Sequence, residues 1–294
     1  MNKVGFIGVG IMGKSMVRNL MKAGFELHIY ARTKSKVEDV ISEGAQFHES
    51  IKDCVQDCDA VITIVGFPQD VEEVYFDGGN ILDSAKKGAY LIDMTTTSPQ
   101  IAEKIYEEGT KRGFHVMDAP VTGGDTGAKA GTLSILVGGE KEDYEACMPL
   151  FEAMGTNINY QGKAGCGQHC KLANQIMIAG TLSGVCEALT YAKEQGLDPE
   201  VFMKSVATGA AGSKQLDTFG PKILKDDYAP GFFMKHFIKD MKLALIEANR
   251  KGLSLDVLSM VLANYEELEQ EGYGDLGTQA LMKFYDEEHR NMDE

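Results

Sequence analysis

Residues 4–13 read Val4-Gly5-Phe6-Ile7-Gly8-Val9-Gly10-Ile11-Met12-Gly13, and residues 14–22 continue with helical periodicity. This order predicts a strand, a glycine turn and a helix. Gly8 suits the tight turn, Gly10 lets a pyrophosphate approach the backbone, and Gly13 lets the helix pack closely on the strand. Phosphates would meet the N–H groups at the positive end of the helix. The pattern favours dinucleotide binding over a merely structural turn, and the residues expected to contact the ligand are Gly8, Gly10, Ile11, Met12 and Gly13.

The second predicted strand, residues 27–30, leads into a basic segment about 20 residues past the glycines. An NAD-specific site places an Asp or Glu there, on the ribose 2′-hydroxyl. This chain has Arg32, Thr33 and Lys36 instead. Arg can contact a 2′-phosphate through two donors and Lys can attract it as a point charge. The segment therefore favours NADP over NAD, while an ordinary basic helix start would allow both cofactors.

Apolar runs and helical segments then alternate as far as residue 160. Strands are expected over residues 60–65, 90–94, 115–118, 133–139 and 157–160, with helices over 37–43, 98–112 and 141–154. This alternation predicts a Rossmann-type, doubly wound α/β domain over residues 1–163. Ligands of such sheets lie beyond the carboxyl ends of the strands. The loop residues expected on the nicotinamide side are Val65, Phe67, Pro68 and Thr96, although helix capping alone could explain the Thr and Ser residues of residues 95–98.

Asp118-Ala119-Pro120-Val121-Thr122-Gly123-Gly124 follows the strand at residues 115–118. The backbone N–H groups of the two glycines, with the Thr122 hydroxyl, could surround a carboxylate as an anion-binding nest. A tight turn explains the two glycines equally well. On pattern alone the segment leaves both readings open.

Residues 164–294 show helical patterning throughout, so an all-α second domain is expected. Residues 168–195 exceed an ordinary helix in length and are expected to bridge the two domains. Lys171 lies at this junction, where a lysine could exchange a proton with a ligand held between the domains. Taken alone, a lysine near a helix start is usually a solvated surface residue.

Composition restricts the class of partner. The 294 residues carry a formal net charge of −15, which argues against nucleic acid. No run of about 18 apolar residues occurs, so no membrane span is expected. Six cysteines without a secretory signal predict free thiols in a reducing, cytoplasmic compartment. The pairs Cys54 with Cys58 and Cys166 with Cys170 lack the usual zinc spacing, and no metal is expected.

With these motifs in place, the chain resembles the β-hydroxyacid dehydrogenase family, which includes 3-hydroxyisobutyrate dehydrogenases and semialdehyde reductases. Four motifs agree in order: the glycine turn, the segment at residues 118–124, Gly165-x-Gly167-x-x-x-Lys171, and Lys239-Asp240. The resemblance implies that Lys171 relays a proton while a hydride moves between substrate and nicotinamide. It also implies that Thr122, Gly123 and Gly124 hold the substrate carboxylate and that Lys239 lies near the cofactor.

The chain departs from the family pattern after the catalytic lysine. Many members have two asparagines there, and the one four residues on contacts the lysine across a helical turn. This chain has Asn174 and Gln175, so either residue could take the role. Thr122 also stands where many relatives have Ser, and it keeps the hydroxyl while adding a methyl group.

The sequence therefore predicts an oxidoreductase that transfers a hydride between NADP(H) and a small β-hydroxyacid or its semialdehyde or keto acid. Desolvation beside a positive nicotinamide would bring the pKa of Lys171 closer to the working pH. The resemblance further implies a homodimer or homotetramer. The alternative is a catalytically silent dinucleotide-binding regulator of the same fold. Oxidative decarboxylation of a phosphorylated sugar acid is disfavoured, because the second half lacks an obvious phosphate-binding Arg cluster.

Overall fold

The computed structural model describes residues 1–285 and divides the chain into two compact units, Met1–Lys171 and a second unit that starts at Leu172. The predicted boundary between residues 163 and 164 precedes a long helix, α10 (Cys166–Glu194), whereas this division by contacts falls inside that helix. Each unit has its own hydrophobic core.

Six parallel strands form the larger part of the sheet in the first unit, in the order β3-β2-β1-β4-β5-β6. This is the strand order of a doubly wound dinucleotide-binding fold, as predicted. The strands are β1 Lys3–Ile7, β2 Glu26–Tyr30, β3 Gln46–Phe47, β4 Ala60–Thr63, β5 Tyr90–Asp93 and β6 His115–Asp118. The register pairs Ile7 with both Tyr30 and Thr63, and Asp93 with Thr63 and Asp118. The loops that follow these strands therefore start at one edge of the sheet.

Beyond β6 the sheet continues with strands of mixed direction. β8 (Leu133–Gly139) runs antiparallel to β6, and β9 (Gly155–Gly162) runs parallel to β8. The two-residue strand β7 (Val121–Thr122) pairs antiparallel with β8. The segment that carries Thr122 is thus fixed to the sheet by β8.

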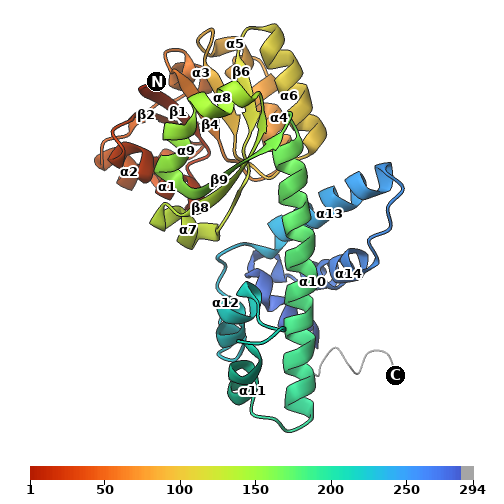
Figure 1. Cartoon of the computed structure of the whole chain (residues 1–294). Coiled ribbons are helices and arrows are strands. Elements are labelled where there is room, and N and C mark those ends of the chain that lie inside the picture. The colour runs from red at the N-terminus through yellow and green to blue at the C-terminus, as the bar shows by residue number, and fades with distance from the viewer. Residues whose placement is uncertain (286–294) are drawn as a thin grey trace. The chain divides into compact units, whose positions relative to one another are not determined.

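Helices cover both faces of this sheet (Figure 1). Successive residues of a strand face opposite sides, so Phe6 and Ile62 belong to one core while Ile7 and Val61 belong to the other. Helix α1 contacts α7 and α9, whereas α5 contacts α3 and α4, and α4 also contacts α6. The bounds are α1 Ile11–Lys22, η1 Lys34–Lys36, α2 Glu38–Ser42, α3 Ile51–Val55, α4 Pro68–Phe76, α5 Ile81–Ser84, α6 Pro99–Lys111, α7 Gly124–Ala130, α8 Lys141–Ala146 and α9 Met148–Met154.

The long helix α10 runs from Cys166 to Glu194 and has 29 residues, close to the prediction of 168–195. Within the described part of the chain it is the one helix long and apolar enough to cross a membrane by length and composition. A single such helix is weak evidence, because the core helix of a soluble protein passes the same test. The expectation that the chain spans no membrane stays a prediction.

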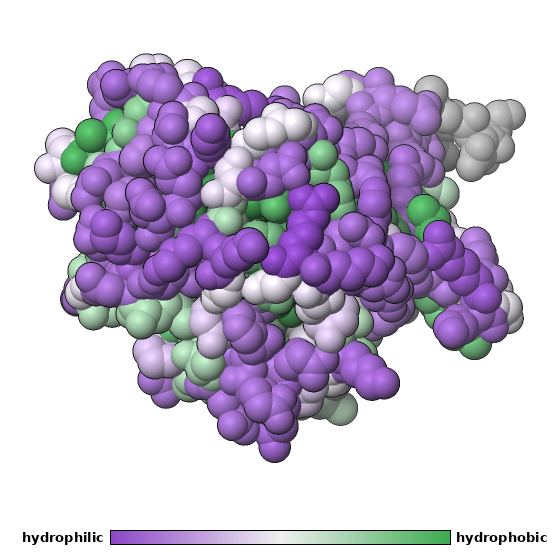
Figure 2. Space-filling model, turned by 90° about the horizontal axis from the view of Figure 1, so that it is seen from above, coloured by the Kyte–Doolittle hydropathy of each residue, from purple (hydrophilic) through white to green (hydrophobic). Residues whose placement is uncertain are grey.

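The second unit is helical, with one isolated β-bridge between Phe233 and Gly277 in its described residues. After α10 its elements are α11 Pro199–Val206, α12 Lys214–Ile223, α13 Met234–Arg250, α14 Asp256–Gln270, η2 Tyr273–Asp275 and η3 Thr278–Tyr285. Helix α12 continues through Pro221 to Ile223. Only one N–H is lost there, in the last turn of the helix. Figure 2 shows a mostly hydrophilic face of the molecule.

Candidate active site

The glycine turn between β1 and α1 has the geometry that its three glycines predict. Gly8 has φ +98°, a conformation that side chains rarely adopt, and a Cβ there would overlap the Ile64 carbonyl. A Cβ at Gly13 would overlap the Gly8 carbonyl oxygen and lie 3.2 Å from Phe6 Cε1. A Cβ at Gly10 would meet no atom within 4 Å. Gly8 and Gly13 are therefore required by the protein itself, whereas Gly10 borders open space.

The N-terminus of α1 can receive an anion. Its N-cap residue is Gly10, no side chain caps it, and its first turn has no acidic residue. Ile11, the first helical residue, is 55% exposed. N–H groups at a helix start favour negative charge. The turn and the helix start thus fit the pyrophosphate of a dinucleotide.

The basic segment after β2 lies at the same edge of the sheet, since Ile7 pairs with Tyr30. Arg32 Nη2 donates to Asp70 Oδ1 at a distance of 2.7 Å. The other oxygen of Asp70 accepts from the Phe67 backbone N–H at 3.0 Å. Asp70 therefore links Arg32 to the start of α4, where Phe67 is the N-cap and Pro68 the first helical residue. Thr33 and Lys36, which follow Arg32 in the sequence, are both exposed.

The loops after β4 and β5 are bonded to each other. The Val65 N–H donates to Thr95 Oγ1 at 3.0 Å, and the Thr95 N–H donates to Asp93 Oδ1 at 3.2 Å. Asp93 also accepts from Thr63 Oγ1 at 2.7 Å. Burial raises the pKa of Asp93 to about 6, against the effect of the hydrogen bonds from Thr63 and Thr95. Thr96, the expected cofactor contact, is half-buried within this bonded segment.

Asp118 connects the substrate motif to the start of α10. Its Oδ1 accepts from the Gly165 N–H and its Oδ2 accepts from the Gln168 N–H, each at 2.8 Å. A carboxylate at a helix N-terminus satisfies N–H groups that have no partner within the helix. Burial raises the pKa of Asp118, against the lowering effect of these two backbone bonds. This role of Asp118 was not predicted from the sequence, although an Asp that ends a buried strand is a usable signal.

Two glycines of the Gly165-x-Gly167 motif make this contact sterically feasible. Gly165 has φ +85°. A Cβ at Gly167 would lie 2.8 Å from both the backbone oxygen and Oδ2 of Asp118. The motif therefore allows the start of α10 to approach β6 closely. Lys171, one turn further along α10, is buried with 7% of its surface exposed.

Gly123 lies between β7 and α7, and Gly124 is the first residue of α7. Both residues have positive φ, +127° and +63°, and Gly123 is the N-cap of α7. A tight turn is therefore present. Whether its N–H groups also bind a carboxylate, as the resemblance implies for Thr122, Gly123 and Gly124, stays a prediction.

In the second unit, Asp240 organises a group of polar side chains. Gln175 Nε2 donates to Asp240 Oδ2 at 2.7 Å, and Asn174 Nδ2 donates to Gln175 Oε1 at 2.8 Å. Lys239 Nζ lies 3.1 Å from Asp240 Oδ1. Asp240 and Gln175 are both buried. The sequence left open whether Asn174 or Gln175 contacts the catalytic lysine. In the structure the two residues form one hydrogen-bonded pair.

Four of the six cysteines are buried in the cores. All six are free thiols, and Cys54 and Cys58 lie in the core. Burial raises the pKa of the Cys58 thiol to about 12. Within residues 1–285, no group of three or more His, Cys, Asp or Glu side chains is placed to hold a metal ion.

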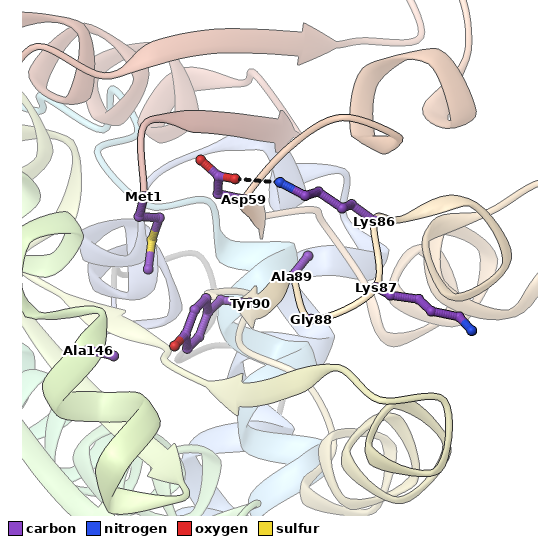
Figure 3. Close-up of a pocket in the computed structure, with 8 residues that line it drawn as sticks. All are labelled: Met1, Asp59, Lys86, Lys87, Gly88, Ala89, Tyr90 and Ala146. Carbon is purple, nitrogen blue, oxygen red and sulfur yellow. Dashed lines mark hydrogen bonds and ion pairs between the residues drawn. The ribbon is translucent and has the colours of Figure 1, made fainter.

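A hollow of about 370 Å³ lies at the opposite, amino edge of the sheet (Figure 3). Asp59 precedes β4, Tyr90 begins β5, and the Lys86 ammonium lies 2.9 Å from Asp59 Oδ1. These residues are at the other ends of the strands from the glycine turn. The hollow is therefore separate from the expected cofactor site.

Family comparisons agree with this arrangement. Residues 3–162 match the model of the NAD-binding domain of 6-phosphogluconate dehydrogenase, and residues 165–285 match the NAD-binding model of NADP-dependent 3-hydroxyisobutyrate dehydrogenase. The chain belongs to the β-hydroxyacid dehydrogenase family. It is an NAD(P)-dependent hydroxyacid dehydrogenase, with a nicotinamide dinucleotide as cofactor.

Individual relatives cover nearly the whole chain. The uncharacterized oxidoreductase YkwC of Bacillus subtilis is 49% identical over 96% of this chain and 98% of its own. The 2-hydroxy-3-oxopropionate reductase of Escherichia coli is 37% identical over 86% of each chain. The structure of Mycobacterium tuberculosis 3-hydroxyisobutyrate dehydrogenase with L-serine superimposes with a TM-score of 0.89 at 26% identity, covering 97% of this chain and 99% of that one. The predicted family and fold are confirmed.

Proposed function

We propose that this enzyme reduces a small semialdehyde or keto acid to its β-hydroxyacid with NADPH, and that Lys171 is the general acid/base. The observation that carries the proposal is the Asp118 contact with Gly165 and Gln168, because it fixes the helix of Lys171 to the strand that precedes Thr122. Two separate motifs of the chain are thereby joined in one unit. In the oxidative direction the same residues would work in reverse.

The cofactor would be held by the glycine turn and by the N-terminus of α1. Arg32, Thr33 and Lys36 supply donors for a 2′-phosphate. The bond from Arg32 to Asp70 uses one of the five N–H donors of a guanidinium and holds the side chain at the end of β2. The bound nicotinamide supplies the hydride in reduction and accepts it in oxidation. Val65, Phe67, Pro68, Thr96 and Lys239 are proposed to complete the cofactor site.

The protein's own chemistry is proton transfer and orientation. Lys171 Nζ donates a proton to the carbonyl oxygen as that oxygen becomes a hydroxyl, and neutral Lys171 removes this proton in oxidation. Thr122, Gly123 and Gly124 hold the substrate carboxylate through a hydroxyl and backbone N–H groups. Asn174 and Gln175 orient polar groups near the reaction, and the bonds from Asn174 to Gln175 and from Gln175 to Asp240 support this role.

The names of two relatives narrow the substrate class. One is a reductase of 2-hydroxy-3-oxopropionate, a three-carbon acid with an aldehyde, and the other is a 3-hydroxyisobutyrate dehydrogenase. Both names describe a carboxylate with an oxygen on the β-carbon. We propose substrates of three or four carbons with the same arrangement.

A homo-oligomer and a cytoplasmic location complete the proposal. Met177 and Tyr191 are 73% and 67% exposed on α10, and their spacing of about four turns places them on one side of the helix. Large apolar side chains on one helix side support burial against another copy of the chain.

The cytoplasmic location is supported by the six free thiols, which suit a reducing compartment.

The test is turnover on a substrate panel. The enzyme is assayed with NADPH and then with NADH on tartronate semialdehyde and methylmalonate semialdehyde, which carry the carbonyl on the β-carbon. Glyoxylate and succinic semialdehyde, which carry it on the α-carbon and the γ-carbon, are assayed for comparison. The proposal expects NADPH to be preferred and Lys171→Ala to lose at least about 100-fold in kcat, the lower range for a general acid. If Lys171→Ala keeps full activity, the assignment of Lys171 is wrong. Binding of NADPH without turnover on any member would place the substrate outside this class.

A further inference from the structure

Gln168 is a fully buried polar residue in the first turn of α10, and its side-chain amide is bonded at both ends. Its Oε1 accepts from the Thr97 N–H at 3.0 Å, and its Nε2 donates to the Thr95 carbonyl at 2.7 Å. Its backbone N–H donates to Asp118 Oδ2 at 2.8 Å. One residue therefore joins the loop after β5, the end of β6 and the start of α10, all within the first unit.

The Gln168 side chain bonds to the backbone of residues 95–97 in the way that the backbone of a neighbouring strand would. Thr95 and Thr97 are two residues apart, and a primary amide supplies the one donor and one acceptor that their backbone groups need. An apolar side chain of equal size would leave both backbone groups without these partners. The amide thus holds Thr96, which lies between them, in a set position.

The same residue has a fixed relation to the proposed proton donor. Gln168 precedes Lys171 by three positions on α10, so both lie on one side of the helix. The loop that it holds follows β5 at the carboxyl edge of the sheet, where ligands of such folds lie. A movement of the loop relative to α10 would break two buried hydrogen bonds.

We propose that Gln168 is a positioning residue, which sets the loop at residues 95–97 against the first turn of α10 so that the nicotinamide and Lys171 meet the same substrate carbonyl. The inference rests on the proposed role of Lys171. It assigns no chemical step to Gln168. The amide acts through the loop on one side and through the helix on the other.

The first test uses Gln168→Ala, with Gln56→Ala as the matched control because Gln56 is exposed. In the protein without cofactor, amide hydrogen exchange over residues 94–98 is expected to be at least about tenfold faster in Gln168→Ala, since Thr97 loses its acceptor. With NADPH and the best substrate, kcat is expected to fall by about tenfold or more. The KM for NADPH is expected to change by less than about threefold, because the glycine turn and Arg32 are untouched.

A second variant, Gln168→Glu, keeps the shape of the side chain. A protonated carboxyl can still accept from Thr97 and donate to Thr95, whereas an ionised one cannot donate. The titratable groups near Gln168 are Asp118, which accepts from its backbone N–H, Asp93, which accepts from the Thr95 N–H, and His169 and Lys171 on α10. The ratio of variant to wild-type kcat is therefore expected to fall as pH rises, and taking the ratio removes the titration of groups common to both proteins.

The outcomes separate the two proposals. Faster exchange at residues 94–98 together with a lower kcat in Gln168→Ala, and a pH-dependent ratio for Gln168→Glu, would support the positioning role. Faster exchange with unchanged kcat, or unchanged exchange, would overturn it, because the amide would then be structural or dispensable. If Lys171→Ala retains full activity, the proposed function fails, whatever the result at Gln168.

Discussion

The three glycines of the β1–α1 turn are required for different reasons, and alanine substitution can separate them. A Cβ at Gly10 meets no protein atom within 4 Å, and its φ of −86° is accessible to alanine. Alanine is a poorer N-cap residue than glycine but also restricts the unfolded chain, and these effects of up to about 1 kcal/mol oppose each other. The free energy of unfolding of Gly10→Ala is therefore expected to lie within about 1 kcal/mol of wild type.

Gly13→Ala should behave in the opposite way. Its Cβ would overlap the Gly8 carbonyl oxygen, which is backbone and cannot rotate aside. Overpacking of this kind costs about 1–3 kcal/mol, and a backbone neighbour places the cost near the upper end. Gly13→Ala is thus expected to lose about 2–3 kcal/mol of stability.

Cofactor affinity should fall in Gly10→Ala although the fold survives. If a pyrophosphate lies where the methyl group would project, the clash costs about 1–3 kcal/mol, which corresponds to a rise in Kd of about 5- to 150-fold. Urea unfolding measures the stability, and fluorescence titration with NADPH measures the Kd. Gly78→Ala is the matched control, since its Cβ also meets nothing within 4 Å. An NADPH Kd for Gly10→Ala within twofold of wild type would refute the reasoning.

Two further predictions concern charge. Because burial raises the pKa of Asp93 from 3.8 to about 6, the folded protein binds this proton more tightly than the unfolded chain, and wild-type stability falls as pH rises through that window. The stability of Asp93→Asn relative to wild type should therefore increase by about 2–2.5 kcal/mol between pH 4 and pH 7 in urea unfolding, and a constant difference would argue against the cause given. Arg32→Ala should raise the Kd for NADPH by about 10- to 100-fold and leave the Kd for NADH within about threefold of wild type. An equal rise in Kd for both cofactors would argue against a contact between Arg32 and the 2′-phosphate.

Local sequence patterns predicted the elements that have a clear periodicity or a glycine turn. The glycine turn, the strand alternation and the length of α10 were all visible in the sequence. Shorter elements were not, because the two-residue strand β3 and the five-residue helix α3 are too short for periodicity to appear. A single helix expected over residues 141–154 is divided at Cys147 into α8 and α9. Pro149 explains the division, since it has no N–H to continue the hydrogen bonds of α8.

The site was predicted by residue type but not by contact. Lys171 and Thr122 could be named from their motifs, whereas the residues that connect those motifs could not. Asp118 bonds to an N–H 47 residues away, and Gln168 bonds to one 71 residues away. A pattern in a short stretch of sequence cannot predict such hydrogen bonds. Their partners are brought together only by the sheet register and by the close approach at Gly167.

The central claim, that Lys171 transfers the proton, is tested most directly by chemical rescue. Lys171→Ala is assayed with NADPH and the best substrate in the presence of increasing methylammonium, with Lys163→Ala as a control for loss of a neighbouring exposed lysine. The account predicts that the amine restores turnover in proportion to its concentration in Lys171→Ala and has no effect on the control. Activity of Lys171→Ala near the wild-type level without any amine would contradict the claim.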